Sequence, residues 1–264
     1  MPRAAAKLAV AHDPTFYPTE DDMGQGSLQR LVSELLRALI ERWLETRGIA
    51  AFVGANQFFY WEQFNSSEGI APDVYVLPGA PRSPKINSWK VWETHLLPSF
   101  ALEIVSSEVD KDYLATPAKY ARLGVEELIV FDPDFALSRS RVRFQVFRRT
   151  KRGLLRVVDS SDADRVKSRV LGCYLRVVGT EGALRVRLAT GFNGETLFPT
   201  DADAARADAA QAKAETAQAK AEAVQAKAEA VQAELKVERE ARAALEAEIA
   251  RLRAAPNPRK PGRK

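Results

Sequence analysis

Residues 99–107, SFALEIVSS, form an apolar run that carries one acidic residue, Glu103, near its centre. A short apolar run bounded by serines is typical of a buried strand. An ionised carboxylate is costly among apolar side chains unless it is paired, protonated or bound to a cation. The segment therefore predicts a buried strand and makes Glu103 a candidate functional residue.

A second acidic residue lies at the start of the preceding strong strand. In residues 70–79, IAPDVYVLPG, Pro72 can occupy only the start or edge of a strand, and Asp73 follows it directly. If the two strands are neighbours in one sheet, Asp73 and Glu103 converge on a point where one hard cation can bind. Mg²⁺ typically takes one or two carboxylates in this way. The spacing leaves another interpretation open, in which Glu103 pairs with a buried Arg or Lys and Asp73 caps a turn.

The order of elements along the chain predicts the fold class. Residues 27–47 carry apolar side chains at helical spacing, and so do residues 110–123, although Pro117 kinks this second helix or delays its start. Residues 127–133, ELIVFDP, are typical of another buried strand. From residue 141 onward charged and apolar residues alternate, which indicates antiparallel strands. We therefore expect an α/β protein whose mixed (α+β) sheet carries helices on its faces and extra antiparallel strands.

Four segments, taken in order behind the leading helix, resemble one known family. They are PDVYVLPG at 72–79, ALEIVSS at 101–107, YARLGV at 120–125 and ELIVFDP at 127–133. Their order and spacing resemble the Uma2 family of restriction endonucleases, within the PD-(D/E)XK nuclease superfamily. The resemblance extends over residues 27–132, and more loosely to about residue 186.

The resemblance implies a restriction-endonuclease-like core that hydrolyses DNA phosphodiester bonds with the help of a metal. In such an enzyme Asp73 and Glu103 hold Mg²⁺ or Mn²⁺, with the carbonyl of Ile104 as a further ligand. The implied activity is that of a Mg²⁺-dependent endodeoxyribonuclease, and the implied partner is DNA.

Two positions depart from the pattern that the resemblance implies. The superfamily places a Lys two residues after the second acid, where this chain has Val105. The family commonly supplies a Lys from the following helix instead, at the position of Thr116. Lys119 is three residues further on and nearly on the same helical face, so it is the candidate catalytic amine, with Lys111 as the alternative. These departures leave a second function open, a catalytically inactive nuclease fold that binds DNA or protein as an adaptor.

Composition excludes several classes of site. A single cysteine, Cys173, allows no internal disulfide and no cysteine-based zinc site, which favours a cytoplasmic protein. No apolar run approaches the roughly 18–20 residues of a membrane span. The net charge of +4 allows a phosphate-bearing partner. A basic stripe either neutralises DNA phosphates or is an ordinary solvated strand face: Arg139, Arg141, Arg143, Arg148, Arg149, Lys151 and Arg152.

The C-terminal segment has a different composition from the rest. Residues 201–255 contain no Gly, Pro or aromatic residue, and a seven-residue repeat begins at Ala210. These features predict a long helix with one seam at alternating spacings of three and four residues, ending before Pro256. The seam consists of Ala217, Ala221, Val224, Ala228, Val231, Leu235, Glu238, Arg242, Leu245, Ile249 and Leu252. We predict a coiled coil that forms a homo-oligomer or binds a partner helix through residues 210–254; the alternative is a solvated single helix.

The predicted organisation therefore has four parts. Residues 1–24 are a flexible N-terminal arm, residues 25–200 the nuclease-like domain, residues 201–255 the Ala-rich coiled-coil helix, and residues 256–264 a basic disordered tail.

Overall fold

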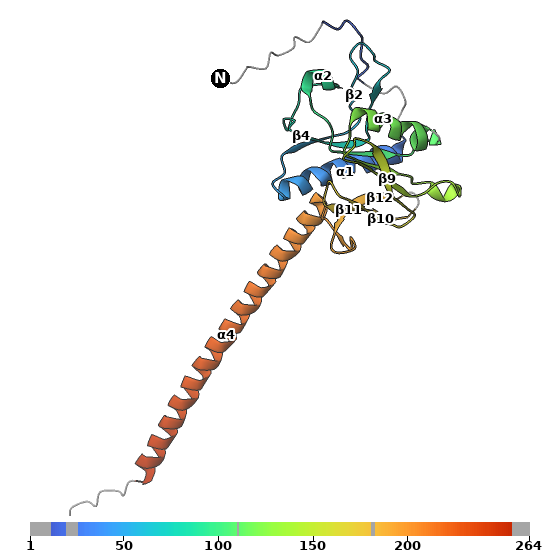
Figure 1. Cartoon of the computed structure of the whole chain (residues 1–264). Helices are drawn as coiled ribbons and strands as arrows, with labels where there is room; N and C mark the ends of the chain where they lie inside the picture. Colours follow the sequence, from blue (N-terminus) through green and yellow to red (C-terminus); the bar gives the residue numbers. More distant parts are fainter. Residues whose placement is uncertain (1–11, 20–25, 110, 181–182, 255–264) are drawn as a thin grey trace, which may run out of the picture. The chain divides into compact units, whose positions relative to one another are not determined.

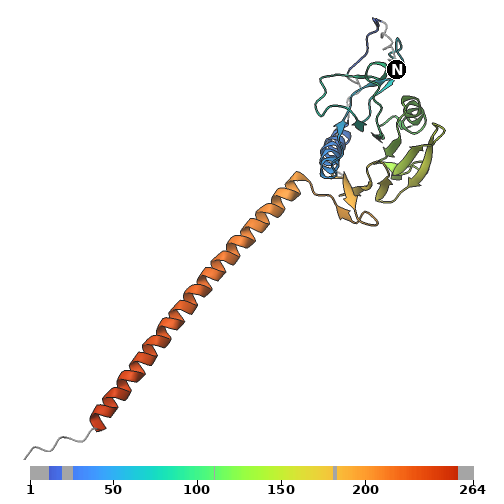
Figure 2. The same ribbon diagram turned by 60° about the vertical axis from the view of Figure 1, so that its left-hand side comes forward.

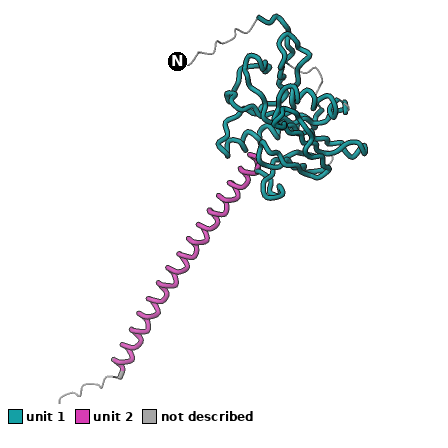
Figure 3. Tube along the Cα trace, in the orientation of Figure 1, with its two compact units in different colours: residues 1–198 teal, residues 199–264 magenta. Residues whose placement is uncertain are grey.

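The computed structural model describes residues 12–19, 26–109, 111–180 and 183–254. It divides into two compact units, residues 1–198 and 199–264 (Figure 3). Of the predicted N-terminal arm only residues 12–19 are described, and there Tyr17 is buried and packs against Tyr60 with ring centroids 4.9 Å apart. The predicted basic tail, residues 256–264, lies outside the described residues.

The first unit contains a mixture of helices and strands (Figure 1). The helical elements are α1 (Ser27–Thr46), α2 (Val91–Thr94), the π-helix η1 (Lys111–Ala115), α3 (Thr116–Leu123) and the 3₁₀ turn η2 (Phe135–Leu137). The strands are β1 (Ala51–Gly54), β2 (Phe59–Tyr60), β3 (Gly69–Ile70), β4 (Val74–Pro78), β5 (Trp89–Lys90), β6 (Phe100–Ile104), β7 (Glu127–Phe131), β8 (Phe144–Arg149), β9 (Leu155–Ser161), β10 (Arg165–Ser168), β11 (Cys173–Val178), β12 (Arg185–Thr190) and β13 (Thr196–Leu197).

The main sheet has six strands in the order β1-β4-β6-β7-β8-β9. Strands β6 and β7 are parallel, and the other neighbours in this sheet are antiparallel. The predicted α/β fold with a mixed sheet is therefore confirmed. The alternating segment after residue 141 divides in two: β8 and β9 extend the main sheet, while β10 to β13 form a separate antiparallel sheet. The short strands β3-β2-β5 make a third sheet.

Apolar side chains form a core on each face of the main sheet. On one face, α1 and the second sheet pack against Val74, Val76 and Leu102, and Figure 1 shows α1 between β4 and β10–β12. Figure 2, in which α1 is seen nearly end-on, gives the same arrangement. On the other face, α3 and the third sheet pack against Tyr75 and Ala101. Alternation along β6 therefore directs Glu103 toward the α3 face, since successive side chains of a strand point to opposite faces.

The second unit is a single helix, α4 (Asp201–Ala254). Its first turn is capped reciprocally: the Asp203 N–H donates to Thr200 Oγ1 at 3.1 Å, and the Thr200 N–H donates to Asp203 Oδ2 at 3.0 Å. The predicted long C-terminal helix is confirmed; its pairing with another helix stays a prediction. Among the described residues, we find no helix with the length and apolar character needed to cross a membrane.

Candidate active site

The two acidic residues singled out in the sequence belong to neighbouring segments of the main sheet: Asp73 directly precedes β4, and Glu103 lies in β6. Val74 of β4 pairs with Leu102 of β6 in an antiparallel ladder. One residue further along this register, Asp73 lies across from Glu103. Side chains in such opposed positions have Cβ atoms about 5 Å apart, so the two carboxyl groups share one site.

The Asp73 carboxylate is buried, with 2 % of the residue exposed, and both of its oxygens accept hydrogen bonds. The backbone N–H of Ile104 donates to Oδ2 at 2.7 Å, and the Gln29 amide donates to Oδ1 at 2.6 Å. Because the N–H and C=O of one strand residue point to the same side, the Ile104 carbonyl also faces the Asp73 side of β6. The structure therefore brings the Asp73 side chain to the backbone of Ile104, next to Glu103.

The Glu103 carboxylate is partly buried beneath α3. Tyr120 of α3 is fully buried and donates its hydroxyl hydrogen to Glu103 Oε1. This contact spans 17 residues of sequence and fixes the carboxylate against the helix. The tyrosine of the YARLGV segment is therefore part of the site.

A third acidic residue supports the loop after β6. Asp112 is buried in η1, and its Oδ2 accepts from the Ser106 N–H at 2.7 Å and from the Ser106 hydroxyl at 2.9 Å. Single π-helical turns inside helices occur frequently at functional sites. Here η1 precedes α3 directly, and Pro117 lies in the first turn of α3, which accounts for the irregular start that the sequence predicted. Asp110, the first residue of the predicted helix, lies outside the described residues.

The electrostatics of the pair favour neutralisation. Burial raises the pKa of Asp73 from 3.8 to about 6, although the hydrogen bonds from Ile104 and Gln29 oppose the shift. Burial and the nearby Asp73 charge raise the pKa of Glu103 well above 4.5, and the Asp112 charge adds to this. The ion pairs in the described part of the chain involve other carboxylates, such as Asp132 and Glu127. The site is therefore a pair of carboxyl groups that hold protons more tightly than free ones and are suited to a cation.

The two candidate lysines occupy different surroundings. Lys119 is exposed, and its amine donates to the carbonyl of Gly69 in β3 at 3.3 Å. Lys111 lies at the start of η1, where it pairs with Glu108 at 2.8 Å and its charge lowers the pKa of Glu103. The neighbour of Lys119 along α3, Tyr120, is the residue that contacts Glu103. Of the two amines, that of Lys111 is the one whose charge acts on Glu103.

Comparison with known proteins identifies the family of the chain. The family model described as "Uma2: Putative restriction endonuclease" matches residues 21–177, which is more than half of the chain. The chain belongs to the Uma2 family. The match includes both carboxylates, η1 and α3. No curated protein matches the chain.

One solved structure to which the chain shows similarity is a crystal structure described as "a putative nuclease belonging to DUF820" from Anabaena variabilis. It has 17 % sequence identity, and the alignment covers 57 % of this chain and 76 % of that chain with a TM-score of 0.40.

The two positions that lack an expected lysine, Val105 in the superfamily pattern and Thr116 in the family pattern, are buried in the structure. Val105 is 5 % exposed and packs in the core on the α3 face, together with Tyr120. Thr116 is also 5 % exposed, at the first position of α3. An uncharged side chain fills each of these two positions.

Three arginines of the basic stripe stabilise the fold. Arg141 forms a bidentate pair with the buried Asp132, at 2.6 and 2.5 Å, and Arg148 pairs with the buried Glu127 at 2.7 Å. Arg149 donates to backbone carbonyls in the last turn of α3, such as that of Ala121 at 2.8 Å. The exposed cations left in this segment include Arg139, Lys151 and Arg152.

The Asp132–Arg141 pair also holds η1 in place, through Tyr113. The Tyr113 hydroxyl donates to Asp132 Oδ2 at 2.7 Å and accepts from the Val142 N–H at 3.1 Å. We expect Tyr113→Phe to lower the free energy of unfolding by about 2 kcal/mol, because it removes a hydrogen bond to a buried charged group. Urea unfolding measures this change. In Tyr174→Phe the lost bond to Phe192 is exposed, so that variant is the control and should lose less than about 1 kcal/mol. Equal losses in both variants would contradict the assignment.

Three residues of the site were missed by the sequence interpretation: Gln29, Asp112 and Tyr120. A signal existed for Gln29, which lies three residues before Val32 and seven before Leu36 and so shares the buried stripe of α1. A polar residue on an apolar stripe is itself informative. For Asp112 the segment offered no comparable signal, since several charged residues follow each other there.

Proposed function

We propose that this chain is a divalent-metal-dependent endonuclease that hydrolyses DNA phosphodiester bonds at the Asp73–Glu103 site. The observation that carries the proposal is the opposition of two carboxyl groups across β4 and β6, both with raised pKa values. Like charges so placed destabilise each other unless a proton or a cation lies between them. Membership of the Uma2 family of restriction endonucleases supports the same function.

The residues present fit Mg²⁺ or Mn²⁺. Carboxylate and carbonyl oxygens are the ligands that these hard cations prefer, and Asp73, Glu103 and the Ile104 carbonyl provide them. In the described part of the chain, no group of three or more His, Cys, Asp or Glu side chains is placed to hold a metal. Mg²⁺ commonly binds through one or two carboxylates, with water and substrate phosphate completing its coordination, so two carboxylates suffice.

In the proposed reaction each residue has a separate task. Lewis acidity toward the scissile phosphate is what a bound divalent cation supplies. Gln29 and the Ile104 N–H hold the Asp73 carboxylate, and Tyr120 holds that of Glu103, so the two ligands keep their positions. Lys111 offsets negative charge that develops on the phosphate, because its charge acts on Glu103.

The two lysines provide a matched test of this assignment. We expect Lys111→Met to lower the rate of Mg²⁺-dependent plasmid nicking at least tenfold, since it removes a positive charge near the reacting phosphate. Lys119→Met should change the rate less than about twofold, because the Lys119 amine contacts Gly69. The reverse order of effects would return the catalytic role to Lys119.

A specific observation favours a second candidate function, that of an inactive adaptor. Val105 and Thr116 are buried and cannot supply an amine at their own positions. The full-length chain, incubated with supercoiled plasmid and Mg²⁺ or Mn²⁺, distinguishes the two functions. Nicking that stops with EDTA supports the endonuclease. DNA retardation in a gel without any nicking under either metal supports the adaptor.

We further infer that α4 joins the chain to another helix through residues 210–254. Apolar side chains recur along it at heptad spacing and are exposed in the single chain, among them Val224, Val231 and Leu245. The partner is a second copy or the helix of another protein.

A further inference from the structure

The outer face of the second sheet carries positive charge. Along β10, β11 and β12 the buried side chains of Val166, Leu175 and Val186 belong to the core that contains α1. Because successive side chains of a strand point to opposite faces, the basic residues that alternate with them lie on the other face. We call this the basic face, and it consists of Arg165, Lys167, Arg176, Arg185 and Arg187. The three strands contain no acidic residue.

The strand register places three of these arginines side by side. Arg165 pairs with Arg176 across β10 and β11, and Arg176 pairs with Arg187 across β11 and β12. Like charges directly opposite each other destabilise a sheet. Asp164 compensates part of this charge, since its carboxylate pairs with Arg165 at 2.7 Å and with Arg176 at 3.2 Å. One carboxylate between two arginines leaves a net positive charge, which attracts an anionic partner.

An exposed aromatic ring lies beside the basic face. Phe192 is in the turn between β12 and β13, and 89 % of it is exposed. The Tyr174 hydroxyl donates to the Phe192 carbonyl at 2.8 Å. Arg165 and Arg176 donate to the carbonyls of residues 193 and 195, at 2.9 and 3.0 Å. The sheet therefore holds this turn in place, and a ring that is already fixed loses little freedom when it binds a partner.

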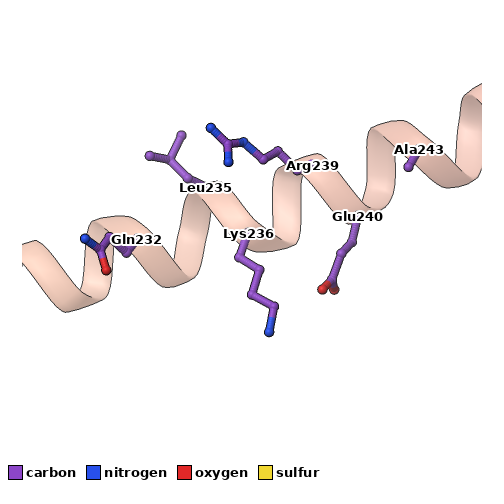
Figure 4. Close-up of a pocket in the computed structure, with 6 residues that line it drawn as sticks. All are labelled: Gln232, Leu235, Lys236, Arg239, Glu240 and Ala243. Atoms are coloured by element: carbon purple, nitrogen blue, oxygen red, sulfur yellow. The ribbon is translucent and has the colours of Figure 1, made fainter.

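The charges around a hollow on α4 differ from those of the basic face. Lys236, Arg239 and Glu240 line this hollow, and Figure 4 shows Lys236 and Glu240 projecting from the same side of the helix. Opposite charges four residues apart on a helix offset each other. On the basic face, in contrast, neighbouring strands contribute charges of one sign. The basic face is therefore better suited to a polyanion than the hollow on α4.

We propose that the basic face and Phe192 bind single-stranded DNA, with phosphates on the basic face and one base stacked on the Phe192 ring. A positively charged surface beside an exposed aromatic ring is the arrangement with which proteins bind single strands. Lys167 and Arg185 contact the phosphates directly. Arg165 and Arg176 contribute their charge, since their donors also hold the turn.

This site is separate from the candidate active site. The second sheet packs in the core that contains α1, whereas Glu103 faces α3 on the other side of the main sheet. The inference therefore does not depend on the proposed nuclease activity. A chain that binds single-stranded DNA without nicking plasmid supports this inference alone, and a chain that nicks plasmid without binding through the basic face overturns this inference alone.

Fluorescence anisotropy with a labelled thymidine oligonucleotide of about 20 nucleotides tests the stacking contact. The full-length chain is measured in EDTA, so that cleavage does not interfere. We expect Phe192→Ala to weaken binding about tenfold, because the ring that stacks on a base is lost. Phe16→Ala is the matched control, since it removes a ring that is 82 % exposed and lies outside the basic face, and it should leave the Kd unchanged. Equal losses in both variants, or no loss in Phe192→Ala, overturn the inference.

The salt dependence of the same binding tests the phosphate contacts. For single strands the slope of log K against log salt concentration changes by about 0.7 for each phosphate neutralised. We expect Lys167→Gln and Arg185→Gln each to reduce the slope by about this amount. Lys85→Gln removes the same charge from an exposed position before β5 and should leave the slope unchanged. If all three variants reduce the slope equally, only net charge matters and the basic face is not the site.

Two competitors separate a single strand from other polyanions. Inorganic polyphosphate carries phosphates without bases, so it should displace the labelled oligonucleotide less than an unlabelled one of equal charge. Equal displacement would show that the bases make no contribution and overturns the inference. A DNA duplex of the same length should also compete less, because its bases are stacked on each other. A duplex that binds as tightly as the single strand overturns the assignment of Phe192.

Discussion

Glu103→Gln is expected to reduce Mg²⁺-dependent nicking of plasmid DNA more than about 100-fold. The substitution keeps the size of the side chain and its contact with Tyr120 but removes the negative charge of one of the two ligands. Loss of a group that only orients a metal ligand typically costs 10- to 100-fold, so loss of a ligand should cost more. Initial nicking rates over a range of Mg²⁺ concentrations measure the effect, and excess Mg²⁺ should restore part of it.

Stability separates this chemical effect from unfolding. Glu103 has a raised pKa because it is buried beside Asp73, so its negative charge destabilises the metal-free folded state. Glu103→Gln should therefore leave the free energy of unfolding in EDTA unchanged or higher at pH 7.5. Glu126→Gln, an exposed residue before β7, is the matched control and should retain full nicking activity. Nicking that survives in both Glu103→Gln and Asp73→Asn would reject the site.

Much of the fold could be predicted because local sequence patterns determine where its strands lie. The apolar segment 100–105 and the segment after Pro72 each predicted a strand, and these are the two strands that bring Asp73 and Glu103 into opposition. A charged residue inside an apolar run can be recognised from the sequence alone, because the free-energy cost of burying its charge does not depend on which strand lies beside it. The mixed sheet followed from the order of elements for a similar reason.

Other parts of the site depend on contacts that sequence periodicity does not encode. Gln29 reaches Asp73 across 44 residues, and the choice between Lys111 and Lys119 depends on the π-helical turn that precedes α3. The basic stripe is a further example. The sequence showed that basic residues gather between positions 139 and 152, but only the structure shows that Arg141 and Arg148 pair with buried carboxylates.

The stability of the metal-free chain should fall as the pH rises through the titration of Asp73. The pKa of Asp73 is about 6 in the folded chain, compared with 3.8 for an aspartate in the unfolded chain. Between these values the folded state binds more protons than the unfolded state, so the free energy of unfolding decreases with increasing pH. A pKa shift of this size lowers the free energy of unfolding by about 3 kcal/mol, and this loss is complete above about pH 7. Glu103, whose pKa is also raised, acts in the same direction.

Asp73→Asn isolates this contribution from all other titrating groups. An amide resembles the protonated carboxyl group, so in EDTA the variant and the original chain should be about equally stable near pH 4. Above pH 7 the variant should be more stable by about 3 kcal/mol, as measured by urea unfolding across the pH range. Mg²⁺ should reverse the order at about 1,000 times its dissociation constant, because it binds the folded carboxylate pair and there stabilises the original chain by about 4.1 kcal/mol. If the two proteins keep a constant difference at every pH, Asp73 does not carry the shifted pKa. If Mg²⁺ stabilises them equally, the cation binds elsewhere.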